Sequence, residues 1–146
     1  MSGIVLSTAL SGMLTSAQRL NVSANNVANM QSRGPIPATP PTQPVTQSSS
    51  MGRQVFQALR LSQQSIGAGG QAGGTLASVQ PVTPSYVPQY DPTDPDAGAN
   101  GMVATPNVDP VRETVDQVQA LASYRLNARV MSAGDEMLKS TLDIKT

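Results

Sequence analysis

The first thirty residues repeat their apolar side chains with heptad spacing, and no proline interrupts them. Steps of four and three residues alternate along this seam, which consists of Leu6, Leu10, Met13, Ala17, Leu20, Ala24 and Val27. A mean repeat of about 3.5 residues is typical of a helix that packs along another helix in a left-handed coiled coil. An amphipathic helix on a globular core would show a similar pattern.

Aromatic residues are too few for a large self-contained core. The 146 residues include only Phe56, Tyr86, Tyr90 and Tyr124. Because aromatic side chains contribute much of the buried area of protein cores, their scarcity favours packing of helix on helix over packing on a globular core.

The last forty residues predict a second helix. Asp109 is suited to cap its N-terminus, Pro110 fits the first helical position, and Glu113 lies near the positive end of the helix dipole. Apolar residues follow at a helical spacing: Val111, Val115, Val118, Ala122, Leu126 and Val130. We expect one helix from about 109 to about 142, with this stripe as the second half of the intrachain seam. Gly134 is expected to weaken it by about 1 kcal/mol relative to alanine.

The middle of the chain is rich in proline and glycine, which is typical of irregular structure. Residues 53–61 and 75–82 have the composition of short strands, with the glycine-rich residues 67–74 between them, and residues 33–52 are expected to be extended or disordered. The predicted fold is mainly α, with N- and C-terminal helices paired as a coiled coil and a Pro/Gly-rich irregular insert carrying short β elements. The expected divisions are 1–32, 33–106 and 107–146.

The stretch NVSANNVANM (21–30) concentrates asparagine on a helix that has almost no charge. In the heptad frame, Asn25, Asn26 and Asn29 point away from the seam. Asn21 flanks it, and Gln18 lies on the same outer side. A solvated helix face usually carries Lys and Glu, whereas amides can be covered by protein without the desolvation cost of a charge. The pattern favours an inter-subunit assembly face; a solvated face whose asparagines cap the helix end is the alternative.

The composition excludes several kinds of chemistry. The chain has no Cys and no His, and its nine basic and nine acidic residues cancel. Thiolate and imidazole sites are therefore impossible, and nothing indicates capture of nucleic acid. The carboxylates of Asp91, Asp94, Asp96 and Asp109 could be imagined as calcium ligands, but Asp-Pro turns and a helix cap explain them better. We expect no enzymatic activity, metal or cofactor.

The N-terminal stretch does not have the features of a targeting segment. It lacks an early basic residue, and Ser, Thr and Gly interrupt its apolar residues, so neither a cleaved secretory signal nor a membrane span is expected. A membrane-surface helix would need a basic face, and Arg19 is the only cation in residues 1–30.

Three motifs resemble a known family. QRLNVSANNVAN (18–29) resembles the N-terminal signature of bacterial flagellar rod and hook proteins. A more specific motif, in residues 90–115, is similar to that of the proximal rod proteins in this axial family. Its matching residues are Tyr90, Asp91, Pro92, Pro95, Asp96, Ala97, Gly101, Val103, Pro106, Asn107, Val108 and Asp109. SYRLNARVM (123–131) resembles the final helix, with Tyr124 and Asn127 in matching positions. The chain departs from the family at Asp94, often His, at Met102, often Tyr, and at residues 36–50, which resemble a divergent insertion.

This resemblance implies a fold and a function. Terminal helices would pair in a coiled coil, and many copies would form the hollow rod that transmits motor torque, with Tyr124 and Asn127 on the assembly face. The chain would leave the cytoplasm through the flagellar type III export apparatus, without a cleaved signal, and reach the periplasmic rod of the basal body. Its partners would be copies of itself, other rod proteins, the rod-base adaptor and the membrane ring. A free-standing coiled-coil homodimer or scaffold is the alternative.

Isolated subunits are expected to have poorly ordered ends that become helical on assembly. Two helices of about 25–35 residues with little aromatic core are marginal alone, because most helical stability comes from tertiary packing. Circular dichroism of a dilute solution of the chain should give partial helicity that rises on assembly. Full helicity that melts cooperatively at low concentration would contradict this expectation.

Overall fold

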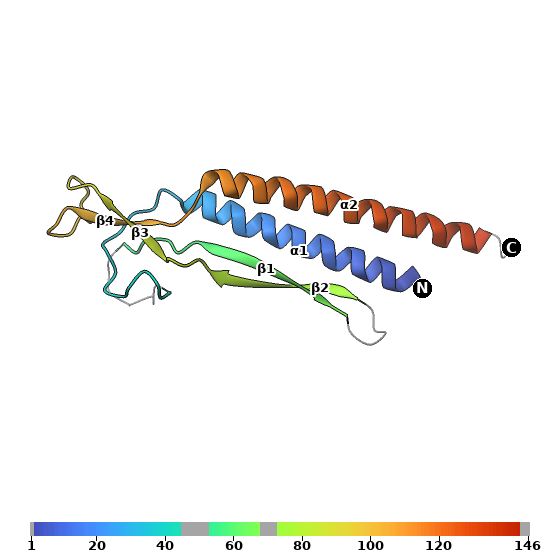
Figure 1. Cartoon of the computed structure of the whole chain (residues 1–146). Helices are drawn as coiled ribbons and strands as arrows, with labels where there is room; N and C mark the ends of the chain where they lie inside the picture. The colour runs from blue at the N-terminus through green and yellow to red at the C-terminus, as the bar shows by residue number, and fades with distance from the viewer. Residues whose placement is uncertain (1, 45–52, 68–72, 144–146) are drawn as a thin grey trace. The chain divides into compact units, whose positions relative to one another are not determined.

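The computed structural model describes residues 2–44, 53–67 and 73–143. Along the chain it contains two helices and four strands (Figure 1): α1 (Ser2–Asn29), β1 (Leu59–Ile66), β2 (Gly74–Pro81), β3 (Tyr86–Tyr90), β4 (Met102–Pro106) and α2 (Pro110–Asp143). The strands form two separate two-stranded sheets. The content is therefore mixed helix and sheet, whereas a mainly α fold was expected.

The chain divides into two compact units, the first built from three separate segments and the second from two. The first unit contains Met1–Asn21, Leu61–Ser78 and Val115–Thr146, and the second contains Val22–Arg60 and Val79–Thr114. The helices and the first sheet contribute to both units. The predicted division at 32 and 106 follows continuous segments of the sequence and stays a prediction.

The residues that predicted the start of α2 have the expected roles in the structure. The Oδ1 atom of Asp109 accepts hydrogen bonds from the backbone N–H groups of Val111, at 3.0 Å, and Arg112, at 3.4 Å. Pro110 is the first helical residue, and its missing N–H costs nothing at that position. The cap at Asp109 is confirmed, and the observed helix differs from the predicted one by one residue at each end.

Within the first unit, α1 and α2 touch where one helix carries a glycine. A Cβ atom at Gly12 would lie 2.7 Å from Nδ2 of Asn127, and a Cβ at Gly134 would lie 3.1 Å from Cδ2 of Leu6. Since the earlier residue of α1 meets the later residue of α2, the helices run antiparallel. Gly134, expected only as a weak point, allows Leu6 to approach the α2 backbone.

Hydroxyl groups attach α1 to β2 in the same unit. Thr8 donates to the carbonyl oxygen of Gly73 at 2.6 Å, and Ser11 Oγ accepts from the N–H of Thr75 at 3.2 Å. Thr15 Oγ1 lies 3.5 Å from the Thr75 carbonyl oxygen. These three residues are spaced by three and four positions, so they share one side of the helix. We call them the hydroxyl row.

The first sheet follows one strand prediction closely and the other poorly. Both ends of β2 lie within one residue of the predicted range 75–82. β1, in contrast, begins at Leu59 and not at residue 53. Val55 and Ala58 are both buried, which a solvent-facing strand with period two does not allow. Residues 68–72 of the predicted glycine-rich connection lie outside the described residues.

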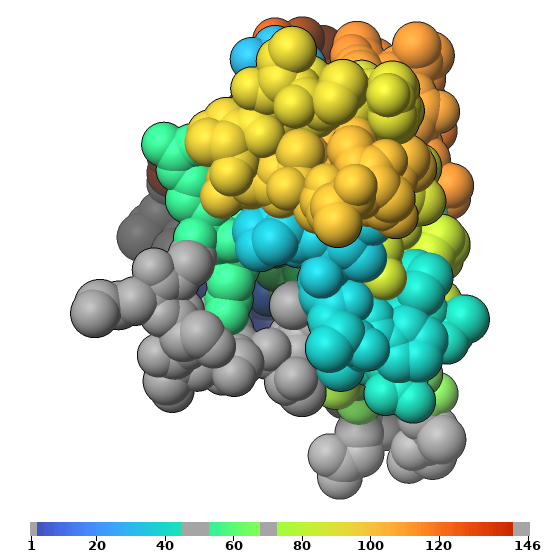
Figure 2. Space-filling view, turned by 90° about the vertical axis from the view of Figure 1, so that its left-hand side faces the viewer, coloured from blue at the N-terminus to red at the C-terminus, as the bar shows by residue number. Residues whose placement is uncertain are grey.

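The second unit contains an antiparallel pair of strands that the sequence did not reveal. β3 pairs with β4 from Tyr86 opposite Pro106 to Tyr90 opposite Met102. The segment after α1 joins them through a bridge between Gly34 and Ala104. Figure 2 shows this segment, in cyan, against the β3–β4 hairpin, in yellow and orange. Val55, Tyr86 and Ala104 form a small buried cluster here.

Gly34 should be intolerant of a side chain. A Cβ there would lie 2.8 Å from the backbone nitrogen of Val55 and 2.9 Å from the carbonyl oxygen of Arg53, and backbone atoms cannot rotate away. Gly34→Ala is expected to lower the free energy of unfolding by about 1–3 kcal/mol, the usual cost of overpacking, measured by urea denaturation.

Gly3→Ala is the matched control, because nothing lies within 4 Å of the added Cβ and the position is helical. It should be neutral or stabilising by up to about 1 kcal/mol. Equal effects of the two substitutions would contradict the packing around Gly34.

Candidate functional site: helix surfaces and the β3–β4 loop

Asn26 joins three segments that are distant in sequence. Its Oδ1 atom accepts from the N–H of Leu59 at 3.0 Å, while its Nδ2 donates to the carbonyl oxygen of Leu59 and to Oε1 of Glu113, both at 2.8 Å. Nearby, Ser23 donates to the Glu113 carbonyl oxygen at 3.1 Å. The amide thus connects the end of α1 to the first residue of β1 and the first turn of α2.

Asn26 was expected on an outer assembly face, and the structure corrects this. Its side chain is 1% exposed, and its bonds are made within the chain. The heptad frame failed here because the covered side of α1 is built from small and polar residues, whereas the frame was set by the larger apolar ones. The buried residues of α1 are Ala9, Thr15, Ser16, Ser23 and Asn26.

Much of the predicted seam is exposed in the single chain. On α1, Leu6, Met13, Ala17 and Val27 are half-buried, while Leu10, Leu20 and Ala24 are exposed. On α2 all six residues are exposed: Val111, Val115, Val118, Ala122, Leu126 and Val130. Val118 and Leu126 retain 63% and 62% of their accessible surface. We call these six residues the α2 stripe; the intrachain contact leaves it uncovered.

The remaining residues of the predicted assembly face are divided between surface and interior. Gln18, Asn21 and Asn25 are exposed on α1, and Tyr124 is 40% exposed on α2. The half-buried Asn29 donates from Nδ2 to the Asn25 carbonyl oxygen at 2.8 Å.

Asn127, also predicted for the assembly face, is half-buried against Gly12. Its Nδ2 donates to the carbonyl oxygen of Ser123 at 2.9 Å. It therefore contributes to the contact between the two helices of one chain.

The loop between β3 and β4 is held by its own aspartates. Asp91 Oδ1 accepts from the hydroxyl of Thr93 at 2.7 Å, and Asp94 Oδ1 accepts from the N–H of Asp96 at 2.9 Å. Gly101 closes the loop with a φ of 70°, where a side chain would be strained. These are local turn contacts of the kind expected for Asp-Pro sequences.

Arg33 connects this loop to the segment after α1. One guanidinium nitrogen lies 2.5 Å from Oδ2 of Asp91 and 3.5 Å from Oδ2 of Asp94. The hydrogen bond from Thr93, followed by that from Arg33, lowers the pKa of Asp91 below its usual value. The same contacts, first with Asp91 and then with Asp94, raise the pKa of Arg33. Arg33 was not among the residues predicted from the sequence.

Other residues of the family motif support this region. Val103 and Pro106 are buried, Pro92 and Tyr90 pack on Gly101, and Asn107 donates to the Pro84 carbonyl oxygen at 3.0 Å. Pro95 is exposed, whereas Asp96, Ala97 and Val108 are half-buried. Among the described residues, no group of three or more acidic residues is placed to hold a metal ion.

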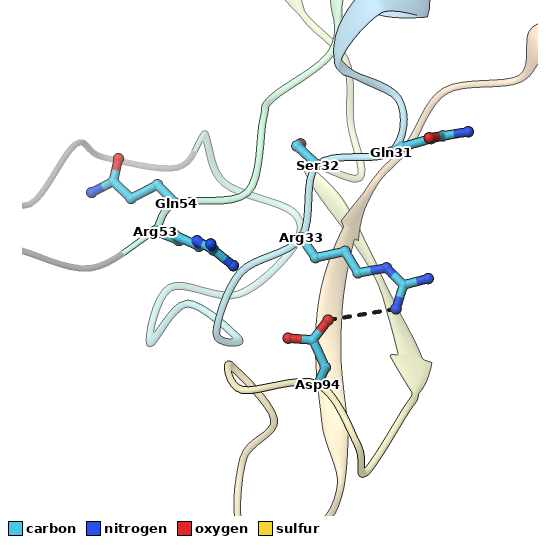
Figure 3. A pocket seen from close by; sticks show the side chains of 6 residues that line it. All are labelled: Gln31, Ser32, Arg33, Arg53, Gln54 and Asp94. Carbon is cyan, nitrogen blue, oxygen red and sulfur yellow. Dashed lines mark hydrogen bonds and ion pairs between the residues drawn. The ribbon is translucent and has the colours of Figure 1, made fainter.

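A pocket of about 450 Å³ opens beside Arg33 (Figure 3). Six residues line it: Gln31, Ser32, Arg33, Arg53, Gln54 and Asp94. The side chain of Arg53 is 74% exposed, and its nearest carboxylate oxygen, Oδ2 of Asp96, is 3.9 Å away. That Asp96 oxygen is buried without a hydrogen bond. No pattern in the sequence predicted this pocket, because its walls come from three separated segments.

Comparison with known proteins shows which class of protein the chain is similar to. Residues 6–35 match the family "Flagella basal body rod protein", and residues 99–144 match "Flagellar basal body rod FlgEFG protein C-terminal". The two matches cover most of α1 and all of α2, so the chain has the terminal helices of a flagellar basal-body rod protein.

Individual relatives show to which family of rod proteins the chain belongs. The chain is 34% identical over 137 residues to the flagellar basal-body rod protein FlgC of Salmonella typhimurium, which covers 92% of this chain and 90% of that protein. It is 28% identical over 134 residues to the protein of the same name from Agrobacterium fabrum, with 92% and 88% covered. With that from Bacillus subtilis it shares 53% identity over 55 residues, 38% of this chain and 37% of the relative. The chain belongs to the FlgC family of flagellar basal-body rod proteins.

Neither helix is both long and apolar enough to cross a membrane, as judged over the part of the chain that the structure describes.

Asn26→Ala should destabilise the second unit. The substitution leaves the N–H and carbonyl oxygen of Leu59 without the Asn26 amide, and a buried polar group without a partner costs about 1–3 kcal/mol. We expect a loss of about 2–4 kcal/mol in the free energy of unfolding, measured by urea denaturation. Asn26→Asp should also destabilise, because a carboxylate cannot donate to Leu59 or Glu113.

Asn29→Ala serves as the control for this pair. Within the described part of the chain, the Asn29 side chain makes one hydrogen bond, to the neighbouring turn of α1, so its removal should cost less than about 0.5 kcal/mol. A loss at Asn26 as small as that at Asn29 would show that the Asn26 contacts do not hold the unit together.

Proposed function

We propose that this structural subunit of the flagellar basal-body rod polymerises with copies of itself and with other rod proteins into a hollow shaft that transmits motor torque. The observation that carries the proposal is the α2 stripe. Its six residues are all apolar, all exposed, and follow one another along a helix of 34 residues.

An uncovered stripe of this length is unusual for a protein that stays monomeric. Large exposed apolar patches mark sites of protein–protein contact. In the single folded chain, Val111, Val118 and Leu126 keep more than half of their accessible surface exposed. Covering it with neighbouring helices would remove that surface from water, at about 25 cal/mol for each Å² of apolar area.

The outer side of α1 offers a second surface for neighbours. Gln18, Asn21 and Asn25 are exposed there, together with Leu10 and Leu14. This surface has apolar and amide groups and no charge, so burial would not require desolvating an ion. We assign it, with Tyr124, to contacts between subunits.

Within one subunit, we propose that α1 and α2 pair as an antiparallel coiled coil. The close approaches at Gly12 and Gly134 support this pairing. The contact uses the small and polar side of α1, leaving larger apolar residues such as Leu10 for neighbouring subunits.

We place the working location in the periplasmic part of the basal body. The route there would be the flagellar type III export apparatus, without a cleaved signal peptide. The rod-base adaptor and the membrane ring would be further neighbours. These assignments rest on the family resemblance of the rod motifs.

Substitution of the α2 stripe tests the proposed function. Val118→Lys places a charge on an exposed position, so the folded chain should keep its helicity and stability within about 0.5 kcal/mol. The charge would have to be buried in the assembled rod, which is costly. Cells whose own copy of the gene is replaced by this variant should lose motility, and electron microscopy should find few complete rods.

Ser132→Lys is the control, because Ser132 is exposed on α2 and does not belong to the stripe. It should retain rods and motility. Normal rods in the Val118→Lys strain would overturn the proposal that the stripe is covered by other subunits.

A further inference from the structure

The outer edge of β1 carries the longest run of unprotected backbone groups among the strands that the structure describes. We propose that this edge, at Leu61, Gln63 and Ser65, pairs antiparallel with the same edge of a second copy of this chain. The two β1–β2 sheets would join into one four-stranded sheet around a two-fold axis at Gln63. This contact goes beyond the proposed rod and does not rest on it, because it uses neither the α2 stripe nor the outer side of α1.

Two sets of hydrogen bonds show which backbone groups of β1 point outward. The carbonyl oxygen of Ala58 accepts from the N–H of Val82 at 2.8 Å, so Ala58 turns its backbone toward β2. Both backbone groups of the next residue, Leu59, bind the Asn26 amide on the opposite edge. The backbone groups of an antiparallel strand alternate between its two edges. Beyond Leu59, the outer edge of β1 therefore consists of Leu61, Gln63 and Ser65.

The other strands each have a feature that protects the edge. On β2, both backbone groups of Thr75 lie against hydroxyls of the hydroxyl row. On β4, Ala104 turns its backbone groups to Gly34, with which it forms a bridge. Pro88 of β3 lies opposite Ala104, so it faces the outer edge of β3 and offers no N–H there. Covered edges and edge prolines are known means of preventing strands from pairing with other molecules.

β1 lacks such protection over the described residues 61–66. The run Leu-Ser-Gln-Gln-Ser-Ile contains no charge and no proline. Gln63 and Ser65 are exposed, and Leu61 is half-buried. Figure 1 shows that β1 has β2 as its neighbour in a sheet of two strands, and such a sheet gains stability when further strands are added. The edge is therefore a template for a strand of another molecule.

The side chains of the run favour a second copy as that partner. In an antiparallel pair centred on Gln63, this residue faces its own copy, and residues 60–62 face residues 64–66. Two facing amides can each donate and accept a hydrogen bond. Arg60, the only charge in β1, would face Ile66 and not a second Arg60. Like charges directly opposite each other would destabilise the pair, and this arrangement contains none.

The Asn26 amide limits the length of the pairing. It already binds both backbone groups of Leu59, so a ladder between two copies ends before that residue. The three outward residues that remain on β1 can all pair with one another only when the axis passes through Gln63. A contact of this kind is isologous and closes after two copies. It therefore gives a dimer of the unassembled chain and not a fibre.

Exchange of charge at the self-facing position tests the pairing. The full-length natural chain should sediment as a dimer that dissociates on dilution. Gln63→Lys and Gln63→Glu should each be monomeric, because like charges would face each other, and an equimolar mixture of the two variants should recover the dimer. Ser132→Lys, exposed on α2, is the control and should leave the dimer unchanged. Circular dichroism should show equal helicity in all four chains.

Disulfide formation tests the register, since the natural chain contains no cysteine. Residues of a hydrogen-bonded antiparallel pair have Cα atoms about 5.5 Å apart, within the range of about 4.4–6.8 Å that a disulfide spans. Gln63→Cys should therefore form a covalent dimer under mild oxidation. Two copies of Ser65→Cys would be separated by four residues along the strands, about 13 Å, and should give about tenfold less dimer. A mixture of Leu61→Cys and Ser65→Cys should again form the disulfide.

Three results would overturn this inference. One is a natural chain that sediments as a monomer at every concentration. Another is a dimer that persists in both Gln63→Lys and Gln63→Glu, which would place the contact on other surfaces such as the helices. The third is a mixture of these variants that stays monomeric, or equal disulfide yields for Gln63→Cys and Ser65→Cys. Either finding would mean that β1 does not face its own copy at Gln63.

Discussion

The hydrogen bonds of Asn26 are the interaction on which the described architecture depends. One amide satisfies both backbone groups of Leu59 and also binds Glu113. It thereby fixes where β1 begins relative to the end of α1 and the start of α2. A side-chain amide has the same donor and acceptor as a peptide group, so it can continue the backbone pairing of a strand from a helix. An apolar side chain of similar size could not.

The same logic explains the unusual distribution of residues on the helices. Small and hydroxyl side chains are buried on α1, while Leu10, Val118 and Leu126 are exposed. Hydrogen bonds from polar side chains join the elements within each unit, while these apolar side chains stay exposed in the single chain. Among the residues that the structure describes, buried apolar side chains are few, and in the second unit Val55, Tyr86 and Ala104 form a small cluster. In the function proposed above, assembly would use these apolar side chains, which the folded chain leaves exposed.

The sequence predicted the helices well because their signals are local. Heptad spacing, the cap at Asp109 and Pro110 at the first position act within one element and are unaffected by tertiary context. The strands β3 and β4 escaped prediction: Pro88 lies inside β3, and a proline normally argues against a strand unless an edge is free. The contacts of Asn26 and Arg33 join residues more than thirty positions apart. Local sequence patterns do not predict contacts between residues so far apart in the chain.

The hydroxyl row has a mechanical consequence. Thr8 holds Gly73, the residue before β2, through a hydrogen bond at an exposed position, where a water molecule can take the place of either partner, and Ser11 holds Thr75 through a partly buried one. Attachments of this kind yield one at a time under load, unlike a packed apolar interface that must open as a whole. We therefore expect the N-terminal part of β2, which the hydroxyl row holds, to separate from α1 under load by losing these bonds one after another.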